Sequence, residues 1–343
     1  MMKRGICALL AACLLFALGG CTAAETKGTT VVDLAGHEVV LPEGSICATA
    51  NSTWITSQIA MLAGADRVGI APKAFESGHT RVFDELVIGT MDIPLADGDK
   101  ISAEAMMEKG VNVFFASNQE EADTYSQAGL TVIVMNYDTT ENLARSFVLI
   151  GEVFGGDALT KGQKIHDHIL SCEQTAKEHS QKAEKGTTVY YIAATTQSTP
   201  YVTQGENTFA NKLFSMCGAT QVTSGMGIYV TVSAEFIMQA DPDYIIIDGY
   251  LAEEAYQELV NDPALKNLTA VQNDNIITAP IGILRPCMRP GAETGIGILW
   301  LTKMLCGEVS EDIDIEKSAI DFYKDCFGWD ISAEEVRAML GYI

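Results

Sequence analysis

The chain has 343 residues, 48% of them hydrophobic and 20% charged, so it is long enough for two globular domains and too apolar to be disordered. It carries 45 acidic and 22 basic side chains, which gives a formal net charge of −23. A surface this acidic repels nucleic acid, and no basic cluster offsets the charge, so we exclude a nucleic acid partner.

The first 20 residues have the form of an export signal. Lys3 and Arg4 precede an apolar run over residues 8–18, which is too short to span a bilayer comfortably. The run ends in L-G-G-C at residues 18–21, which resembles a bacterial lipobox. We therefore expect residues 1–20 to be a signal peptide, Cys21 to be lipidated, and residues 21–30 to be a tether to the membrane. The alternative is an ordinary secretory signal with an incidental cysteine.

Residues 31–139 are predicted to form an α/β lobe that begins with a β-hairpin over residues 31–42. Strands then alternate with helices, which favours parallel pairing in the sheet. The expected strands are 46–50, 68–71, 111–116 and 131–135, and the expected helices are 52–62, 101–109 and 119–127.

Residues 140–185 are predicted to be helical connectors. A helix over residues 140–154 leads into a long polar segment that begins after Gly155 and stops at Gly186. If helical throughout, its roughly 28 residues would be about 42 Å long. The apolar positions make one narrow stripe, so we predict a rigid connecting helix that lies across a surface. The stripe consists of Leu159, Ile165, Ile169, Cys172 and Ala176.

Residues 186–343 repeat the alternation and are predicted to form a second lobe. The expected strands are 187–193, 244–248 and 275–279, and the expected helices are 208–216, 232–239, 252–260, 291–305, 315–327 and 332–340. The tripeptide S-A-E at residues 102–104 recurs at residues 233–235, each time in a helix that precedes a strand. We therefore expect an α/β fold of two Rossmann-like lobes with parallel sheets, joined by one long helix, with a ligand cleft between them.

Several segments together resemble a known family, the substrate-binding lipoproteins of ABC importers in the single-helix-linker class. This class includes the iron-siderophore, haem and vitamin B12 binding proteins. The segments, in chain order, are V-V-D-L-A-G-H-E-V-V-L-P, L-A-G-A-D-R-V-G-I, S-A-E-A-M-M-E-K-G-V-N-V-F-F-A, S-A-E-F-I-M-Q-A-D-P-D-Y-I-I-I and R-P-G-A-E-T-G-I-G-I-L-W-L-T-K-M-L. Residues 109–112 depart from the family, which usually has proline and aspartate before that strand.

The resemblance implies a cleft that closes little, because the connecting helix resists bending. It also implies that this protein is held on the extracytoplasmic face of the cell membrane and that its partners are an ABC permease and its ATPase, and we expect a monomer. In the family one glutamate per lobe docks onto permease arginines, and the matching positions are Glu104 and Glu235. An acid in the first turn of a helix also stabilises the helix dipole, which is the alternative explanation for each glutamate.

Ligands of open α/β sheets bind beyond the C-terminal ends of the strands, so the loops there hold the candidate binding residues. Aromatic side chains can stack on a flat or greasy ligand, and an arginine just before a helix can bind an anion. The alternative for each arginine is a salt bridge to one of the many acids. The candidates are Trp54, Lys73, Asn118 and Tyr137 in the first lobe and Gln197, Tyr201, Tyr229, Arg285 and Arg289 in the second.

Direct metal ligation and a resident cofactor are not expected. Among only five histidines, His166 and His168 would point to different faces of a helix as solvated residues, and only His79 lies near the cleft. A metal chelate recognised through its organic shell needs no such ligands, and an iron-siderophore complex is our first expectation. The alternatives are cobalamin, molybdate, or haem held by His79 or by one of the methionines Met91, Met135 and Met288.

Catalysis is not expected, because the chain has no G-x-S-x-G elbow, no phosphate-binding G-x-x-x-x-G-K-[ST] and no H-E-x-x-H. A surface adhesin or receptor on the same scaffold is the remaining alternative. Six cysteines follow Cys21, none in a C-x-x-C pair, and we interpret them as buried thiols.

Overall fold

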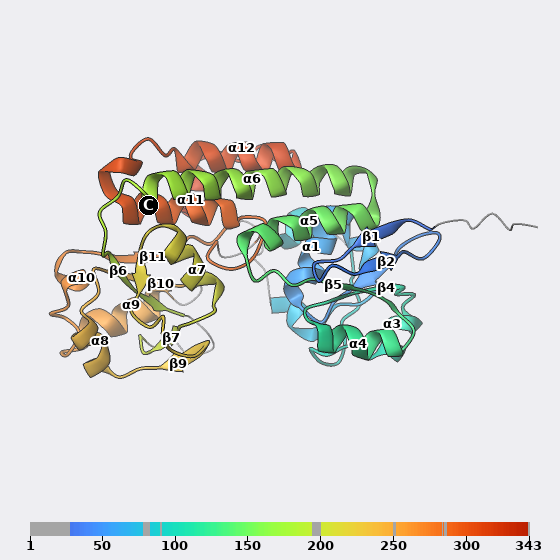
Figure 1. Cartoon of the computed structure of the whole chain (residues 1–343), viewed down its shortest axis with the longest axis horizontal. Helices are drawn as coiled ribbons and strands as arrows, with labels where there is room; N and C mark the ends of the chain where they lie inside the picture. The colour runs from blue at the N-terminus through green and yellow to red at the C-terminus, as the bar shows by residue number, and fades with distance from the viewer. Residues whose placement is uncertain are drawn as a thin grey trace, which may run out of the picture.

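The computed structural model describes residues 28–77, 83–89, 91–193, 200–249, 252–282, 284 and 287–341. Two α/β lobes lie side by side beneath a layer of long helices (Figure 1). The predicted fold class, two lobes with mainly parallel sheets joined by one long helix, is confirmed. The predicted residues Cys21, His79, Gln197 and Arg285 lie outside the described residues.

The predicted N-terminal hairpin is present. Strand β1 (Thr30–Val32) pairs antiparallel with β2 (Glu38–Val40). The buried carboxylate of Asp33 accepts hydrogen bonds from the backbone nitrogens of Ala35 (3.0 Å), His37 (2.8 Å) and Val134 (3.2 Å). Asp33 therefore closes the turn and also ties the hairpin to the sheet of the first lobe.

The first lobe contains a parallel sheet in the order β3-β4-β5, from β3 (Ala48–Thr49), β4 (Val113–Ala116) and β5 (Thr131–Val134). The strand expected at 68–71 is reduced to two isolated bridges, because a 3₁₀ turn occupies the residues just before it and Pro72, which has no N–H, follows. The helices are α1 (Thr53–Ala63), α3 (Ala103–Glu108) and α4 (Gln119–Gln127), with short helical turns η1 (Ala65–Arg67), η2 (Lys73–Ser77) and η3 (Asp84–Ile88).

The second lobe contains a mixed sheet in the order β11-β10-β6-β7-β9. Strands β6 (Thr188–Ile192), β10 (Tyr244–Ile247), β11 (Ile276–Thr278) and β8 (Thr220–Gln221) pair in parallel. Strands β7 (Val202–Gln204) and β9 (Tyr229–Thr231) add an antiparallel edge that the sequence did not reveal. Each has only three residues, too few for a visible alternation. The helices of this lobe are α7 (Phe209–Met216), α8 (Ala234–Ala240), α9 (Ala252–Asn261) and α10 (Thr269–Gln272).

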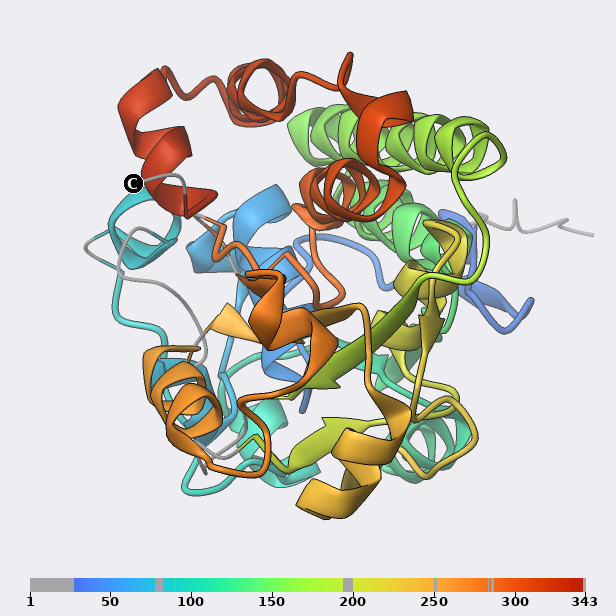
Figure 2. The same ribbon diagram turned by 90° about the vertical axis from the view of Figure 1, so that its left-hand side faces the viewer.

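The connecting helix is α6 (Gly156–Ser180), whose 25 residues give a length of about 37 Å. It runs above both lobes, with α5 (Thr140–Phe154) beneath one half and α11 (Thr294–Cys306) beneath the other (Figure 1). The turn η5 (Gly307–Ser310) follows α11, helix α12 (Ile315–Phe327) packs against α6, and α13 (Ala333–Met339) is the last described helix. Figure 2 shows this helical layer gathered on one side of the molecule.

Glycines bring the helices of this layer close together. A Cβ atom at Gly162 of α6 would lie 2.3 Å from the carbonyl oxygen of Phe147 in α5, and one at Gly151 of α5 would lie 2.5 Å from the Cα of Leu159. On the other side, a Cβ at Gly295 of α11 would lie 2.6 Å from Cδ2 of His168 in α6. No side chain fits at Gly151 or Gly162, so α6 lies in backbone contact with α5, whereas Gly295 leaves room for the His168 side chain between α6 and α11.

The buried face of α6 is wider than predicted. Leu159 is 38% exposed and does not belong to it, whereas Ala158 and Gly162 do. The expectation that His168 is solvated is wrong, since its ring packs 4.7 Å from the ring of Phe322 in α12. Burial lowers the pKa of His168 to about 4, so the imidazole is neutral at pH 7.

One continuous apolar core runs from the first lobe through the helical layer into the second lobe. Two smaller clusters cover the outer faces of the two sheets, one in each lobe. The core also holds most of the cysteines. The six described cysteines are free thiols, and all but Cys47 are buried.

Candidate functional site: the cleft between the lobes

A cavity of about 260 Å³ lies between the lobes. The first lobe contributes Trp54, in the first turn of α1, and Tyr137, from the loop after β5. The second lobe contributes Tyr191, Gln204, Thr208, Phe209, Ala210, Ile228, Tyr229, Met288, Arg289 and Pro290. The two first-lobe residues follow strands β3 and β5, and Met288, Arg289 and Pro290 follow β11, so the cavity lies beyond the C-terminal ends of strands in both lobes, where α/β proteins bind ligands.

Aromatic rings dominate the lining. Five of the residues are aromatic, namely Trp54, Tyr137, Tyr191, Phe209 and Tyr229. At the edge of the second lobe, Ile228 and Tyr229 are 60% and 59% exposed, so apolar surface continues from the cavity toward solvent. Such a lining offers flat faces and apolar edges for stacking.

Arg289 is the charged residue of the cavity lining, and it is paired. Its Nη2 and Nε donate to Oδ2 of Asp248 at 2.7 and 3.1 Å. Asp248 directly follows β10, and its side chain is 1% exposed. The guanidinium carbon of Arg289 also lies 5.8 Å from the centre of the Trp54 ring, so the arginine joins the lobes through a cation–π contact.

The buried environment fixes the protonation of this cluster. Although burial opposes its charge, the neighbouring Asp248 raises the pKa of Arg289, so the guanidinium stays charged. Burial, and then the negative charge of Asp248, raise the pKa of the Tyr191 hydroxyl well above its usual value. Tyr191 therefore presents a neutral hydroxyl beside an arginine whose charge Asp248 already balances.

Four of the predicted binding residues meet in the cavity: Trp54, Tyr137, Tyr229 and Arg289. Their role in binding stays a prediction. The sequence left two interpretations of Arg289, a binding residue of the cleft or a partner in a salt bridge. In the structure Arg289 lines the cleft and also forms a salt bridge with Asp248.

Three other predicted residues lie elsewhere. Lys73 is exposed at the start of η2, and Asn118 accepts the backbone N–H of Glu121 at 2.9 Å as the N-cap of α4. The hydroxyl of Tyr201 donates to Oδ2 of Asp262, and the pKa of Tyr201 rises to about 12 through burial and this neighbour. The sequence shows which residues follow each strand, but it does not show which of these loops turn toward the cleft.

Sequence reasoning missed much of the second lobe's contribution. Tyr191 was interpreted as part of a buried strand, and Gln204 belongs to the unpredicted strand β7. Thr208 and Phe209 stand at the N-terminus of α7, where the Thr208 hydroxyl accepts the backbone N–H of Asn211 at 3.3 Å. The sequence signal that could have indicated Thr208 and Phe209 is the predicted start of the helix at residue 208.

The predicted docking glutamates occupy equivalent places in the two lobes. Ser102 and Ser233 are the N-caps of α3 and α8, each accepting a backbone N–H at 3.2 Å, and Glu104 and Glu235 follow in the first turn. Both glutamates are exposed. The pKa of Glu235 is lowered by a hydrogen bond from its own backbone and one from Ser233. Figure 1 shows α3 and α8 on different lobes, on the side away from α6.

The described ranges of the chain contain neither a metal-ligand cluster nor a membrane-spanning helix. Within these ranges, no group of three or more His, Cys, Asp or Glu side chains could hold a metal ion. None of the helices in the same ranges is both long and apolar enough to cross a membrane.

The Arg289–Asp248 pair generates a prediction about stability. Arg289→Met leaves the buried carboxylate of Asp248 without its counter-charge, so we expect the free energy of unfolding to fall by about 3 kcal/mol in a denaturant titration. Adding Asp248→Asn should restore most of that loss. Arg337→Met, which removes an exposed pair with Glu316, is the control and should cost less than about 1 kcal/mol. Equal losses for the single and double cleft variants would contradict the pairing.

Comparisons with known proteins agree with this architecture. Residues 111–281 match a family model described as periplasmic binding protein. A periplasmic solute binding protein of Veillonella parvula is 20% identical, with a TM-score of 0.76 over 91% of this chain and 96% of that one. The protein MolA of Haemophilus influenzae, bound to molybdate, is 16% identical, with a TM-score of 0.72 over 88% and 99%.

A third structure, CeuE of Helicobacter pylori in a complex with nickel and histidine, is 15% identical, with a TM-score of 0.68 over 91% of this chain and 98% of that one. No curated protein matches the chain. The solved structures show the shared fold, and the family model covers about half of the chain, which holds the connecting helix and all the described strands of the second lobe's sheet. The chain therefore belongs to the periplasmic binding protein family, the extracytoplasmic solute-binding components of ABC importers.

Proposed function

We propose that this protein captures a metal chelate of the iron-siderophore type in the cleft and delivers it to its permease. The observation that carries the proposal is the cavity lining, which contains five aromatic rings and one charge-balanced arginine. The organic shell of a chelate presents flat or apolar faces, and stacking on such faces needs no metal-ligating side chain.

The state of Arg289 distinguishes a chelate from a bare oxyanion. A small anion such as molybdate needs several hydrogen-bond donors whose charge is not already neutralised. In this cavity Nε and Nη2 of Arg289 both donate to Oδ2 of Asp248. The positive charge of Arg289 is thus balanced by Asp248, and the pair offers the cavity a net charge close to zero. Although MolA is bound to molybdate, this lining favours a larger ligand with most of its charge internally balanced.

The size of the cavity adds a constraint. Its volume of about 260 Å³ lies just below the usual 300–1,000 Å³ of ligand pockets. We therefore expect it to enclose one aromatic arm of a chelate, with the remainder against the exposed Ile228 and Tyr229.

Ligand binding can be followed through Trp54. We expect a ferric catecholate siderophore to quench the fluorescence of the purified protein in a saturable way, and to do so more strongly than molybdate, haem or cobalamin. Trp54→Phe should remove most of the quenching, and Tyr229→Ala should raise the Kd about tenfold, because one stacked ring contributes roughly 1 kcal/mol beyond its buried area.

Tyr201→Phe is the matched control, since its hydroxyl bonds to Asp262 outside the cavity, and its Kd should stay unchanged. Saturable binding of molybdate with no response to any chelate would refute the chelate proposal and leave the oxyanion alternative.

Docking on the permease is a separate part of the proposal. Glu104 and Glu235 are supported by their matched, exposed positions, each in the first turn of a helix capped by serine. Because the connecting helix holds the lobes, the spacing between the two carboxylates is fixed and suits two fixed cations on a partner.

Charge reversal tests the docking. In the Glu104→Lys/Glu235→Lys protein we expect cellular uptake of the ligand to fall at least tenfold, with the Kd of the purified protein unchanged. Glu120→Lys/Glu253→Lys makes the same charge change on exposed helices of the two lobes and should leave uptake near normal. Uptake that survives the first pair, or is lost equally with both, would exclude a specific role for these glutamates.

The lipid anchor on Cys21 completes the proposal and is supported by the L-G-G-C segment. We expect Cys21→Ser to move the protein from the membrane fraction to the soluble fraction, because the acyl chains that hold it there are absent. Cys7→Ser, inside the signal segment, is the control. Full membrane retention of Cys21→Ser would rule out the anchor.

A further inference from the structure

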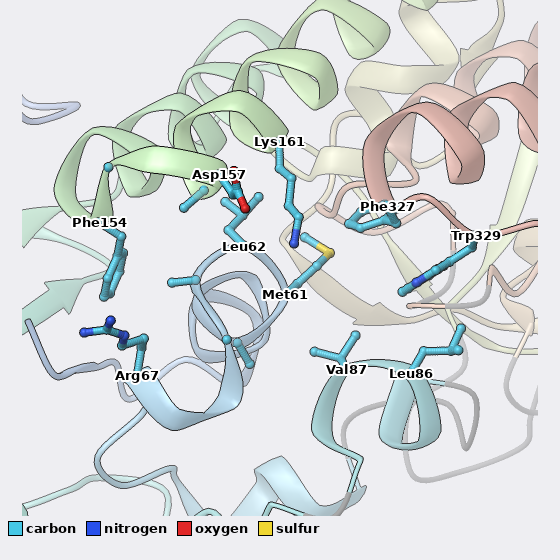
Figure 3. Close-up of a pocket in the computed structure, with 15 residues that line it drawn as sticks. Met61, Leu62, Arg67, Leu86, Val87, Phe154, Asp157, Lys161, Phe327 and Trp329 are labelled. Carbon is cyan, nitrogen blue, oxygen red and sulfur yellow. The ribbon is translucent and has the colours of Figure 1, made fainter.

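A second pocket, of about 410 Å³, lies away from the cleft and shares no residue with it. Its lining comes from the end of α1 with η1, from η3, from the junction of α5 and α6, and from the end of α12 with Trp329 just after it (Figure 3). The proposed import function does not use this pocket.

One part of this second pocket is lined by apolar side chains, while charged side chains and backbone groups supply the rest of its surface. Figure 3 shows Leu86 and Val87 of η3 on one side, facing Phe327 and Trp329, with Met61 and Leu62 of α1 between these groups and Phe154. Leu86 is 46% exposed, an unusual position for a leucine beside two partly buried aromatic rings. The pocket therefore offers a surface against which an alkyl chain can be removed from water.

Two cations and one acid stand in the same pocket. Lys161 extends from α6 toward Met61 (Figure 3) and makes no hydrogen bond or ion pair with any described residue. Arg67 donates to the Ser45 hydroxyl at 2.7 Å, and its Nε lies 3.7 Å from Asp66. Asp157 is exposed at the rim. The lining therefore carries two positive charges and one negative charge in a chain that has twice as many acids as bases.

We propose that this pocket binds a free amphiphile with one alkyl chain and a carboxylate head group. The head group lies at Lys161, with Arg67 contributing at longer range, and the chain lies between η3 and Trp329. Lys161, which is partly buried and has no ion pair with a described residue, then gains a counter-ion, and the exposed face of Leu86 is covered.

Decanoate is the probe, and Trp329 is the reporter. In the Trp54→Phe protein the remaining tryptophans are Trp329 and the buried Trp300, so a change in fluorescence with decanoate reports the second pocket. We expect saturable binding, confirmed by calorimetry, that weakens at least tenfold with decanol or hexanoate, which lack the charge or four methylene groups.

Lys161→Ala should weaken decanoate binding about tenfold, and Lys161→Arg should restore it to within threefold. Lys177→Ala, on the same helix but outside the pocket, is the matched control and should bind normally. Trp329→Phe should bind decanoate by calorimetry but lose the fluorescence change.

Three outcomes would overturn the proposal: no saturable binding of decanoate, equal affinity for decanol, or equal affinity in Lys161→Ala. Phosphatidylglycerol vesicles distinguish a free chain from a lipid surface. Vesicle binding that depends on Lys161, in the absence of decanoate binding, would assign the pocket to the membrane instead.

Discussion

The close packing of α6 against both α5 and α11 is the constraint on which the rest of the structure depends. Gly151 and Gly162 bring α6 against α5 of the first lobe, and Gly295 brings α11 of the second lobe against the same helix. The contacts between α5 and α6 involve backbone atoms, so these two helices cannot slide past each other, and the contact of α11 with α6 is made through the His168 and Cys172 side chains. The lobes are therefore held at a fixed spacing, and the apolar core passes through the helical layer without interruption.

The geometry of the cleft follows from this arrangement. Arg289 stands a few residues before α11, and Trp54 lies in α1, which packs under α5 and α6. The cation–π contact between them is thus held by elements that are themselves fastened to the connecting helix. Under the proposed function, a cavity with two walls fixed in this way would select its ligand by shape and stacking, and binding would lose little to reorganisation.

The same helical layer explains the second pocket. After α12 packs along α6, Phe327 and Trp329 lie opposite η3 of the first lobe. From the sequence, residues 186–343 were expected to belong wholly to the second lobe. In the structure, Phe327 and Trp329 from this region line a pocket together with residues of the first lobe. Residues separated by more than 200 positions share this lining, so neither lobe would form the pocket by itself.

Local signals were enough to predict most helices. The bounds of α4, α5 and α12 agree with the sequence prediction, because caps and 3.6-residue periodicity are written in neighbouring residues. The serine caps of α3 and α8 were likewise recognisable from the repeated tripeptide. Three features could not be recognised from the sequence. They are the short antiparallel edge formed by β7 and β9, the packing of His168 against α12, and the pairing of Arg289 with Asp248, 41 residues away. These features depend on which distant elements meet, and only the tertiary structure decides that, since the contacts are made by chain topology and not by adjacent residues.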